Sequence, residues 1–276
     1  MGLITKTPEL VFGEGWTVGN LASPASGYGY LLFDTNLVAP INDLSDGFTA
    51  SLFFYLPAAA STNGLRFLQT QYYDDLSGPF KNTAYGMFWT TVVSGSDTIF
   101  RITFREGGIA APHINQYVAT VVTSDITLGG WNHIIMGNDG STTTKAYFND
   151  SSVSASKSGT LTTITTDNTH DLIQGGVYST PSTIGGTALG HGFQNIYFGK
   201  GYDDLDTASN RRHFLKANGT PADGVPNPPS NSDPEVFLSG THTTVDHYEN
   251  PGNTGVSHTV TRTNLTLGPR KNIKVF

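Results

Sequence analysis

The sequence Tyr-Asp-Asp-Leu occurs twice, at residues 73–76 and 202–205, and it sets two carboxylates side by side each time. Carboxylate oxygens are hard ligands, and pairs of them in loops at the rim of a β-fold suit Ca²⁺. The candidate calcium ligands are therefore Asp74, Asp75, Asp203 and Asp204. The competing interpretation is solvation or helix capping, because the second pair precedes a predicted helix, where negative charge is favourable without a metal.

Aromatic side chains suggest a second kind of chemistry, the binding of sugars. An exposed ring can stack on the apolar face of a pyranose while nearby polar groups fix the hydroxyls. The candidates near predicted loops and strand ends are Tyr72, Tyr73, Trp89, Tyr178 and Tyr202. The competing interpretation is that these rings fill the core.

Catalytic patterns are weak. Hydrolysis of glycans uses two carboxylates held near one another, and no two of the five glutamates lie within four residues of each other. Carboxylates on separate strands could still meet, so a glycan-cleaving enzyme stays the least favoured alternative. The sequence has no Gly-x-Ser-x-Gly motif and no cysteine, so neither a nucleophile elbow nor a thiol nucleophile is available. We expect a protein that is not an enzyme.

Composition and charge restrict the partners. The formal net charge is −7 and the pI is about 5.5, so a nucleic-acid backbone would be repelled. No stretch approaches the roughly 20 apolar residues of a membrane span. The first residues lack the basic and then apolar pattern of a signal peptide, and we expect synthesis in the cytoplasm.

The elements that must position these residues are mostly strands. Charged residues make up only 13% of the chain, and Gly, Ser, Thr and aromatic residues are abundant, a composition typical of β proteins. Residues 129–150 predict a β-hairpin, because apolar residues alternate on both sides of an Asn-Asp-Gly-Ser turn. Alternation and turn signals predict ten strands, at residues 29–33, 48–56, 64–73, 85–93, 98–105, 117–123, 131–136, 143–148, 192–198 and 236–238. Strands at this spacing favour an all-β, two-sheet antiparallel sandwich, with one short helix near residues 206–217.

The chain divides into three regions by pattern. Residues 26–240 form the predicted sandwich, residues 1–25 an N-terminal arm with a possible assembly contact, and residues 241–276 a C-terminal extension. The last residues are basic and then apolar, and Ile273–Phe276 could add as a strand to the sheet edge of a neighbour. The candidate assembly anchors are Arg270, Lys271, Ile273, Val275 and Phe276.

Two groups of motifs support a resemblance to a known family. The hairpin reads Trp131-Asn-His133, then Asp139-Gly140, then Tyr147-Phe-Asn-Asp150. It resembles the Trp-x-His, Asp-Gly, Tyr-x-Asn-Gly hairpin of laminin-G and concanavalin A-like domains, with Asp150 in place of the usual glycine. Further along the chain, a second group of motifs follows in a fixed order, at residues 196–198, 202–206, 210–214, 218–221 and 234–240. This order is similar to the end of concanavalin A-like domains in bacteriophage virion proteins.

This resemblance covers about residues 28–240 and implies a jelly-roll sandwich used for attachment. The expected protein is a non-enzymatic virion structural protein, on a capsid as a decoration or head fibre, or associated with the tail. It would be made in the host bacterial cytoplasm and would form a homo-oligomer in the particle with other virion proteins. The alternative is a glycan-binding adhesin or tail-fibre receptor-binding protein, for which a host-surface glycan is the partner and calcium the one candidate cofactor.

Overall fold

The computed structural model describes residues 16–18, 30–33, 44–56, 58, 61–74, 83–106, 113–159, 172–174, 176–180, 183–186, 191–223, 226–230, 234, 236–238, 260–263 and 265–267. Strands dominate these residues, as the composition predicts. The strands of the main body are β3 (Phe48–Leu56), β4 (Arg66–Asp74), β5 (Thr83–Ser94), β6 (Asp97–Glu106), β7 (His113–Val122), β8 (Gly130–Asn138), β9 (Thr144–Phe148), β10 (Ser151–Ser158) and β14 (His191–Lys200).

Shorter elements complete the chain. They are β1 (Trp16–Val18), β2 (Tyr30–Phe33), the 3-10 turn η2 (Thr123–Asp125), β11 (Leu172–Gln174), β12 (Gly176–Thr180), β13 (Thr183–Gly186), β15 (Val236–Leu238), β16 (Val260–Thr263) and β17 (Leu265–Leu267). The helix α1 (Ala208–Arg211) has a single turn and lies inside the range predicted for it. Among the described helices none is long and apolar enough to cross a bilayer.

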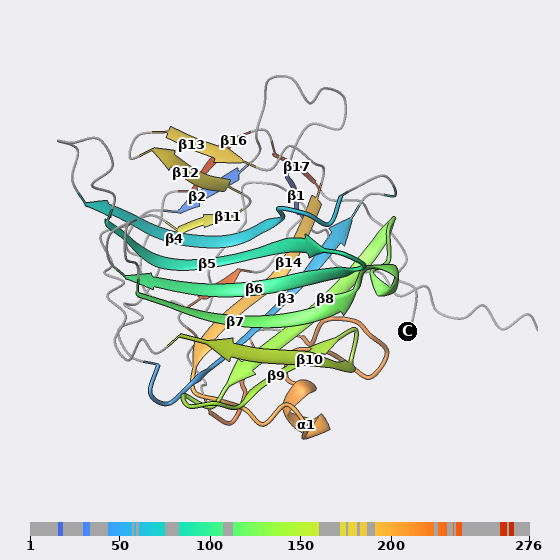
Figure 1. Cartoon of the computed structure of the whole chain (residues 1–276). Helices are drawn as coiled ribbons and strands as arrows, with labels where there is room; N and C mark the ends of the chain where they lie inside the picture. The colour runs from blue at the N-terminus through green and yellow to red at the C-terminus, as the bar shows by residue number, and fades with distance from the viewer. Residues whose placement is uncertain are drawn as a thin grey trace, which may run out of the picture.

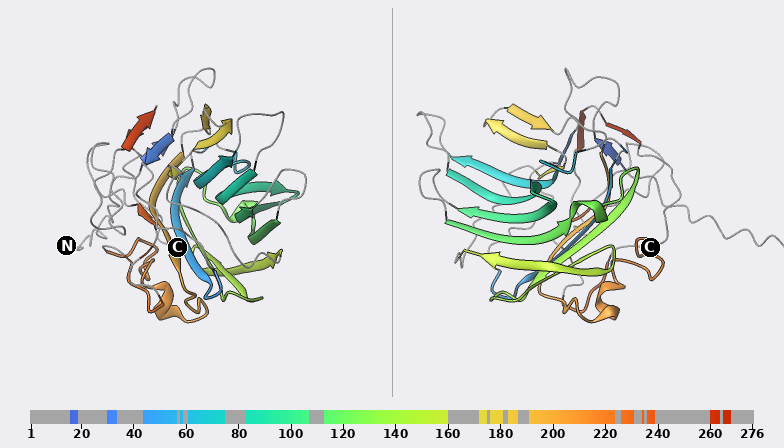
Figure 2. Two further views of the ribbon diagram at one scale, coloured as in Figure 1. Left: turned by 90° about the vertical axis from the view of Figure 1, so that its left-hand side faces the viewer. Right: turned by 45° about the vertical axis from the view of Figure 1, so that its right-hand side comes forward.

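The described strands form one curled antiparallel sheet and a separate β12–β13 pair, so two separate sheets and a jelly-roll order are not confirmed. The hydrogen-bonded order is β16-β2-β11-β4-β5-β6-β7-β10-β9-β8-β3-β14-β1-β17, with β15 paired to β14. The sheet is continuous because β10 pairs with β9 through Ser151–Val153 and with β7 through Ser154–Ser158. Figures 1 and 2 show that the sheet curls over on itself, so that β4–β7 face β3, β8 and β14.

Aromatic side chains fill the space between these two halves of the sheet. Phe54 on β3 lies 5.4 Å from Phe67 on β4, and Phe67 stacks on Phe100 of β6 at 6.1 Å, between ring centroids. At the other end of the core, Phe48 contacts Tyr117 at 4.7 Å and Phe198 at 5.5 Å. Burial of large rings from both halves is the main source of stability in a fold with so little helix.

The second face of β3 and β8 is also buried. Residues 201–223, which include α1, cover it (Figure 2), and they contribute Leu205, Phe214 and Leu215 to apolar clusters with β3, β8, β9, β14 and β15. All residues of β3 are buried, and so are those of β8 after Gly130. The apolar residues on both sides of the β8–β9 hairpin, residues 129–150, are therefore buried.

The turn of this hairpin shows why glycine is needed there. Gly140 has φ +80°, and a Cβ atom on it would lie 1.9 Å from the carbonyl oxygen of Ser45. Gly47, in the same loop as Ser45, has φ +78° and the same conflict with Asn138. The loop before β3 and the β8–β9 turn thus touch backbone to backbone, at a distance only glycine permits.

Both terminal regions contribute strands to the sheet. In the N-terminal region, β1 pairs with β14, and in the C-terminal extension β17 pairs with β1 and β16 with β2. The two ends of the described sheet order, β16 and β17, therefore both come from residues 241–276. The anchor candidates Arg270, Lys271, Ile273, Val275 and Phe276 lie outside the described residues.

Candidate functional site

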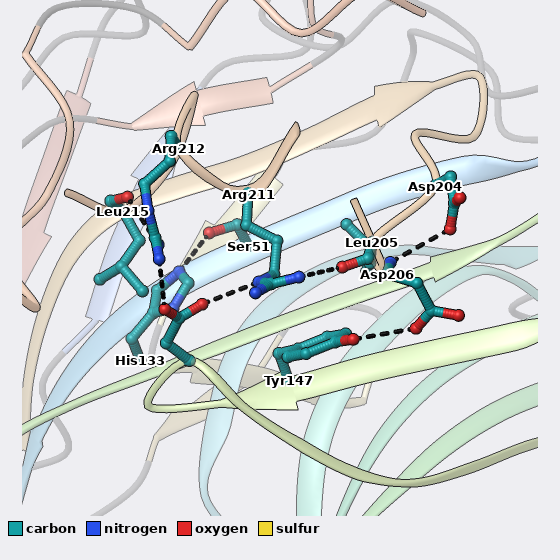
Figure 3. A network of polar contacts seen from close by, with 10 residues as sticks. Ser51, His133, Tyr147, Asp204, Leu205, Asp206, Arg211, Arg212 and Leu215 are labelled. Carbon is teal, nitrogen blue, oxygen red and sulfur yellow. Dashed lines mark hydrogen bonds and ion pairs between the residues drawn. The ribbon is translucent and has the colours of Figure 1, made fainter. Parts of the chain in front are cut away.

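A network of polar contacts lies between the β8–β9 hairpin and the segment that carries α1 (Figure 3). Its centre is Asp150, which follows β9 in a turn with φ +65°. Arg211 Nε donates to Asp150 Oδ1 at 2.7 Å, and Arg212 Nη2 donates to Oδ2 at 2.5 Å. Burial alone would raise the pKa of Asp150, but the hydrogen bonds from Arg212 and Arg211 outweigh it and lower the pKa.

The same network continues away from Asp150. Arg211 also donates to the carbonyl of Leu205, and its guanidinium lies 4.0 Å from the centre of the Tyr147 ring. The Tyr147 hydroxyl donates to Asp206 Oδ1 at 2.9 Å, and Lys145 Nζ pairs with Asp206 Oδ2 at 2.7 Å. Each of these carboxylates is thus held by side chains of the opposite element, an arrangement that docks the α1 segment on the hairpin.

One pair in this layer has the residue types of a catalytic dyad. Ser51 Oγ and His133 Nε2 are 2.8 Å apart. A catalytic histidine also needs an orienting acceptor at its other nitrogen, but the buried Nδ1 of His133 has no hydrogen-bond partner in the structure. The nearby Asp150 carboxylate is bound by two arginines instead.

Burial also separates this pair from any substrate. His133 is 0% and Ser51 2% exposed, and the imidazole lies 4.3 Å from the Phe53 ring. Desolvation lowers the pKa of His133 to about 3, so the ring is neutral near pH 7. The Ser51–His133 contact is therefore a hydrogen bond within the buried core. Neither residue was predicted to be part of a functional site, because their contact joins positions 82 residues apart.

Two of the four predicted calcium ligands, Asp203 and Asp204, have side chains that the structure describes, and both bind other groups of the protein. Asp203 is 3% exposed, and its carboxylate accepts hydrogen bonds from the backbone and hydroxyl of Ser230 at 3.1 and 2.6 Å. Asp204 is exposed and accepts from the backbone of Asp206 and the hydroxyl of Thr207, so its carboxylate closes the turn before α1, whose N-cap Thr207 has no side-chain capping bond. No group of three or more His, Asp or Glu suited to a metal occurs within the described segments. The side chain of Asp74, and all of Asp75, lie outside them.

The predicted sugar-stacking residues differ in how far they are buried. Trp89 is 0% exposed and contacts Phe67 in the core, which removes it from the candidates. Tyr202 is partly exposed, and burial together with the charge of Asp204 raises its pKa to about 12. Tyr72 and Tyr73 lie on β4 and Tyr178 on β12, but their side chains are outside the description.

A broad surface that sequence reasoning missed lies on the outer side of β5, β6, β7 and β10, the side that faces the viewer in Figure 1. Strand pairing places its residues in three cross-strand rows. We call this surface the hydroxyl face; its rows are Val92-Ile99-Thr120-Ser154, Thr90-Arg101-Val118-Ser156 and Thr103-Gln116-Ser158. All eleven side chains are at least partly exposed, and Val92 reaches 36%.

The hydroxyl face is rich in hydroxyl groups. Its three serines alternate with inward residues along β10, and with three threonines and Gln116 they supply most of its polar groups. None of the eleven residues is acidic, although the chain has a net charge of −7. The alternation of serine in residues 152–158 is the sequence signal that could have revealed it.

Comparisons with known proteins give no family. No family model matches the chain, and no curated protein matches it in sequence. Among solved structures it is similar to the enzymatically active domain of tailspike protein 2 from bacteriophage CBA120, with 12% identity and a TM-score of 0.36 over 75% of this chain and 32% of that one.

Two toxin domains show a likeness of the same order. The binding domain of botulinum neurotoxin serotype G has 12% identity and a TM-score of 0.41, over 76% of this chain and 49% of that one. The ligand binding domain of serotype D, in complex with N-acetylneuraminic acid, has 9% identity and a TM-score of 0.38, over 70% and 44%. The chain spans from about a third to about half of these chains, and a likeness at this level assigns no function to it.

Proposed function

We propose that this chain is a non-enzymatic attachment module of a bacteriophage virion, and that its hydroxyl face binds a glycan on the host surface. The hydroxyl face is the observation that carries the proposal. Ser, Thr and Gln side chains both donate and accept hydrogen bonds, as sugar hydroxyls do. Val and Ile between them offer apolar contact to the C–H groups of a sugar ring.

The rigidity of this surface also favours binding. The hydroxyl face lies in the middle of a continuous sheet, and below it the inward side chains of Phe100, Ile102 and Ala119 are 0% exposed. A surface fixed by a packed core loses little entropy when a ligand binds. The three rows offer many weak contacts in a constant geometry, which suits an attachment protein better than a catalyst.

The non-enzymatic part of the proposal rests on how the described polar side chains are bound. The one Ser–His contact that we describe there is buried, and Asp150 and Asp203 are bound to groups of the protein itself. The assignment to a virion rests on the resemblance of the 131–150 hairpin and of the segments in 196–240 to domains of phage virion proteins. Oligomerisation and contact with other virion proteins belong to the same proposal.

A glycan array of bacterial surface polysaccharides tests attachment through the hydroxyl face. Ser156→Tyr places a bulky ring in its central row, and Ser209→Tyr makes the same change at an exposed position of α1. We expect the wild type and Ser209→Tyr to bind the same glycans and Ser156→Tyr to lose them. Absence of all glycan binding, or equal binding by both variants, would refute the proposed function.

Particle assembly is a second candidate function, favoured by the position of β17. This strand pairs with β1 and ends the described sheet order, and the outer edge of such a strand is where a further strand can be added. Deletion of residues 268–276 keeps β16 and β17. Loss of incorporation into particles, with an unchanged melting temperature, is the expected result, and normal incorporation would rule out this anchor.

A further inference from the structure

The hydroxyl face contains one charged residue, Arg101, and it stands in the central row. Strand alternation places Arg101 outward, on the side of Ile99 and Thr103, while Phe100 and Ile102 point into the core with 0% exposure. Its cross-strand neighbours are Thr90 and Val118, which carry no charge. Arg101, which is partly exposed, therefore stands among uncharged neighbours.

Among the residues that the structure describes, Arg101 has no ion-pair partner. The salt bridges between described residues join Lys145, Arg211, Arg212 and Lys216 to aspartates, and none of them includes Arg101. Its Nε is buried and has no hydrogen-bond partner in the described part of the chain. The nearest acidic residue on the same side of β6 is Asp97, four positions away, which is about 13 Å along a strand.

A second arginine extends the same row. Arg66 on β4 pairs with Thr90, which pairs in turn with Arg101. Two strand spacings separate the two arginines, about 10 Å. The row Arg66-Thr90-Arg101-Val118-Ser156 thus holds two arginines and no acidic residue.

We propose that the hydroxyl face selects a carboxylated glycan, and that Arg101 binds the sugar carboxylate while the surrounding hydroxyls bind the rest of the ligand. This inference rests on the proposed function and names its ligand class. The planar fork of a guanidinium matches the two oxygens of a carboxylate, and such charge-assisted bonds are stronger than those between neutral groups. An unpaired cation in a neutral surface supplies the complementary charge.

The net charge of the protein favours an acidic glycan over nucleic acid as the ligand. A net charge of −7 repels nucleic acid, which carries a charge about every 1.7 Å of its axis. A glycan with one carboxylate per repeating unit has a much lower charge density. Its carboxylate can reach Arg101 while its neutral sugars lie against Thr120, Gln116 and the serines of β10.

The experiment measures binding of the full chain to three acidic polymers, hyaluronate, polygalacturonate and polysialic acid, and to the carboxyl-reduced form of each. Reduction converts the carboxylate to an alcohol and leaves the chain of sugars in place. We expect binding to at least one acidic polymer, its loss on reduction, and a decrease with added salt as the charges are screened.

Substitutions then test the role of Arg101. Arg101→Gln should weaken binding to the acidic polymer roughly tenfold, the scale of one charge-assisted hydrogen bond. Arg101→Lys keeps the charge but not the planar fork of the guanidinium, so its affinity should lie between those of the wild type and Arg101→Gln. Lys216→Gln removes the same charge from an exposed pair with Asp223 and should bind as the wild type does.

The outcomes separate this inference from the proposed function. Binding that survives carboxyl reduction, or that is the same in Arg101→Gln, overturns the inference while attachment to glycan stands. Failure to bind any of the acidic polymers also overturns it, and the glycan array then decides the proposed function independently. If Arg101→Gln does not fold, the comparison of acidic with reduced polymer on the wild type still decides the question.

Discussion

His133 should make the stability of this protein depend on pH between 8 and 5. The folded protein holds the imidazole neutral, with a pKa of about 3, because it is fully buried. In the unfolded chain a histidine has a pKa of about 6.5. Between these two values the unfolded state binds a proton that the folded state does not, so stability falls as the pH falls.

The magnitude follows from the unfolded pKa alone while the pH stays well above 3. At pH 5 the solution is about 1.5 pH units below the unfolded pKa, and each unit is worth about 1.4 kcal/mol, so His133 should cost about 2 kcal/mol relative to pH 8. The charge of Asp150 acts to raise this pKa and that of Arg212 to lower it, but both effects are smaller than desolvation. Aspartates such as Asp150, whose pKa is lowered, lose their contribution only below about pH 4.

Urea unfolding at pH 8 and pH 5, followed by tryptophan fluorescence, measures this effect, since Trp89 and Trp131 are both buried. His133→Gln removes the titrating group, and its amide can still bond the hydroxyl of Ser51. This variant will be less stable overall, but the difference between the two pH values should shrink by about 2 kcal/mol. His213→Gln, a change at a partly exposed histidine, is the control and should keep the wild-type difference. An unchanged difference in His133→Gln would refute the reasoning.

Three further substitutions test the packing around the hairpin. Asp150→Asn should lower the free energy of unfolding by about 1–2 kcal/mol, because two arginines lose a partly buried partner, whereas Asp223→Asn, in an exposed pair, should change it little. Gly140→Ala should reduce the melting temperature strongly, since its Cβ would overlap the backbone of the loop before β3. The control Gly95→Ala has open space around it and bears only the cost of a positive φ. Equal effects of the two substitutions on the melting temperature would contradict the backbone contact. Ser51→Ala leaves the imidazole that it contacts without this hydrogen bond and should cost about 1–3 kcal/mol in urea unfolding, and a neutral effect would show that the bond is not needed.

Local patterns predicted the local structure well. The bounds predicted for β3 and β15 coincide with the structure, and the register of Ile134 with Phe148 and of Met136 with Ala146 confirms the hairpin. These elements were predictable because alternating apolar residues record which side of a strand is buried. The β10 strand was missed, because its serines give no apolar alternation although they repeat every second residue.

The closure of the sheet and the polar layer could not be predicted in the same way. A switch of partners within β10 depends on how the whole sheet curls, and no residue of the strand marks it. Asp150 was noted only as a replacement for glycine, yet it joins the hairpin to arginines 61 and 62 residues away. Trp89 was proposed as a surface ring because an outward and an inward tryptophan on a strand look alike in sequence. Contacts between distant residues decide each of these features.

The hydroxyl face is tested most directly by methyl NMR spectra during titration with a glycan that the protein binds. The methyl signals of Ile99, Val118 and Thr120 should shift together as the glycan is added, while those of Ile135, buried on the opposite half of the sheet, should stay in place. Shifts confined to residues outside the three rows, with Ile99 and Val118 unchanged, would contradict the account.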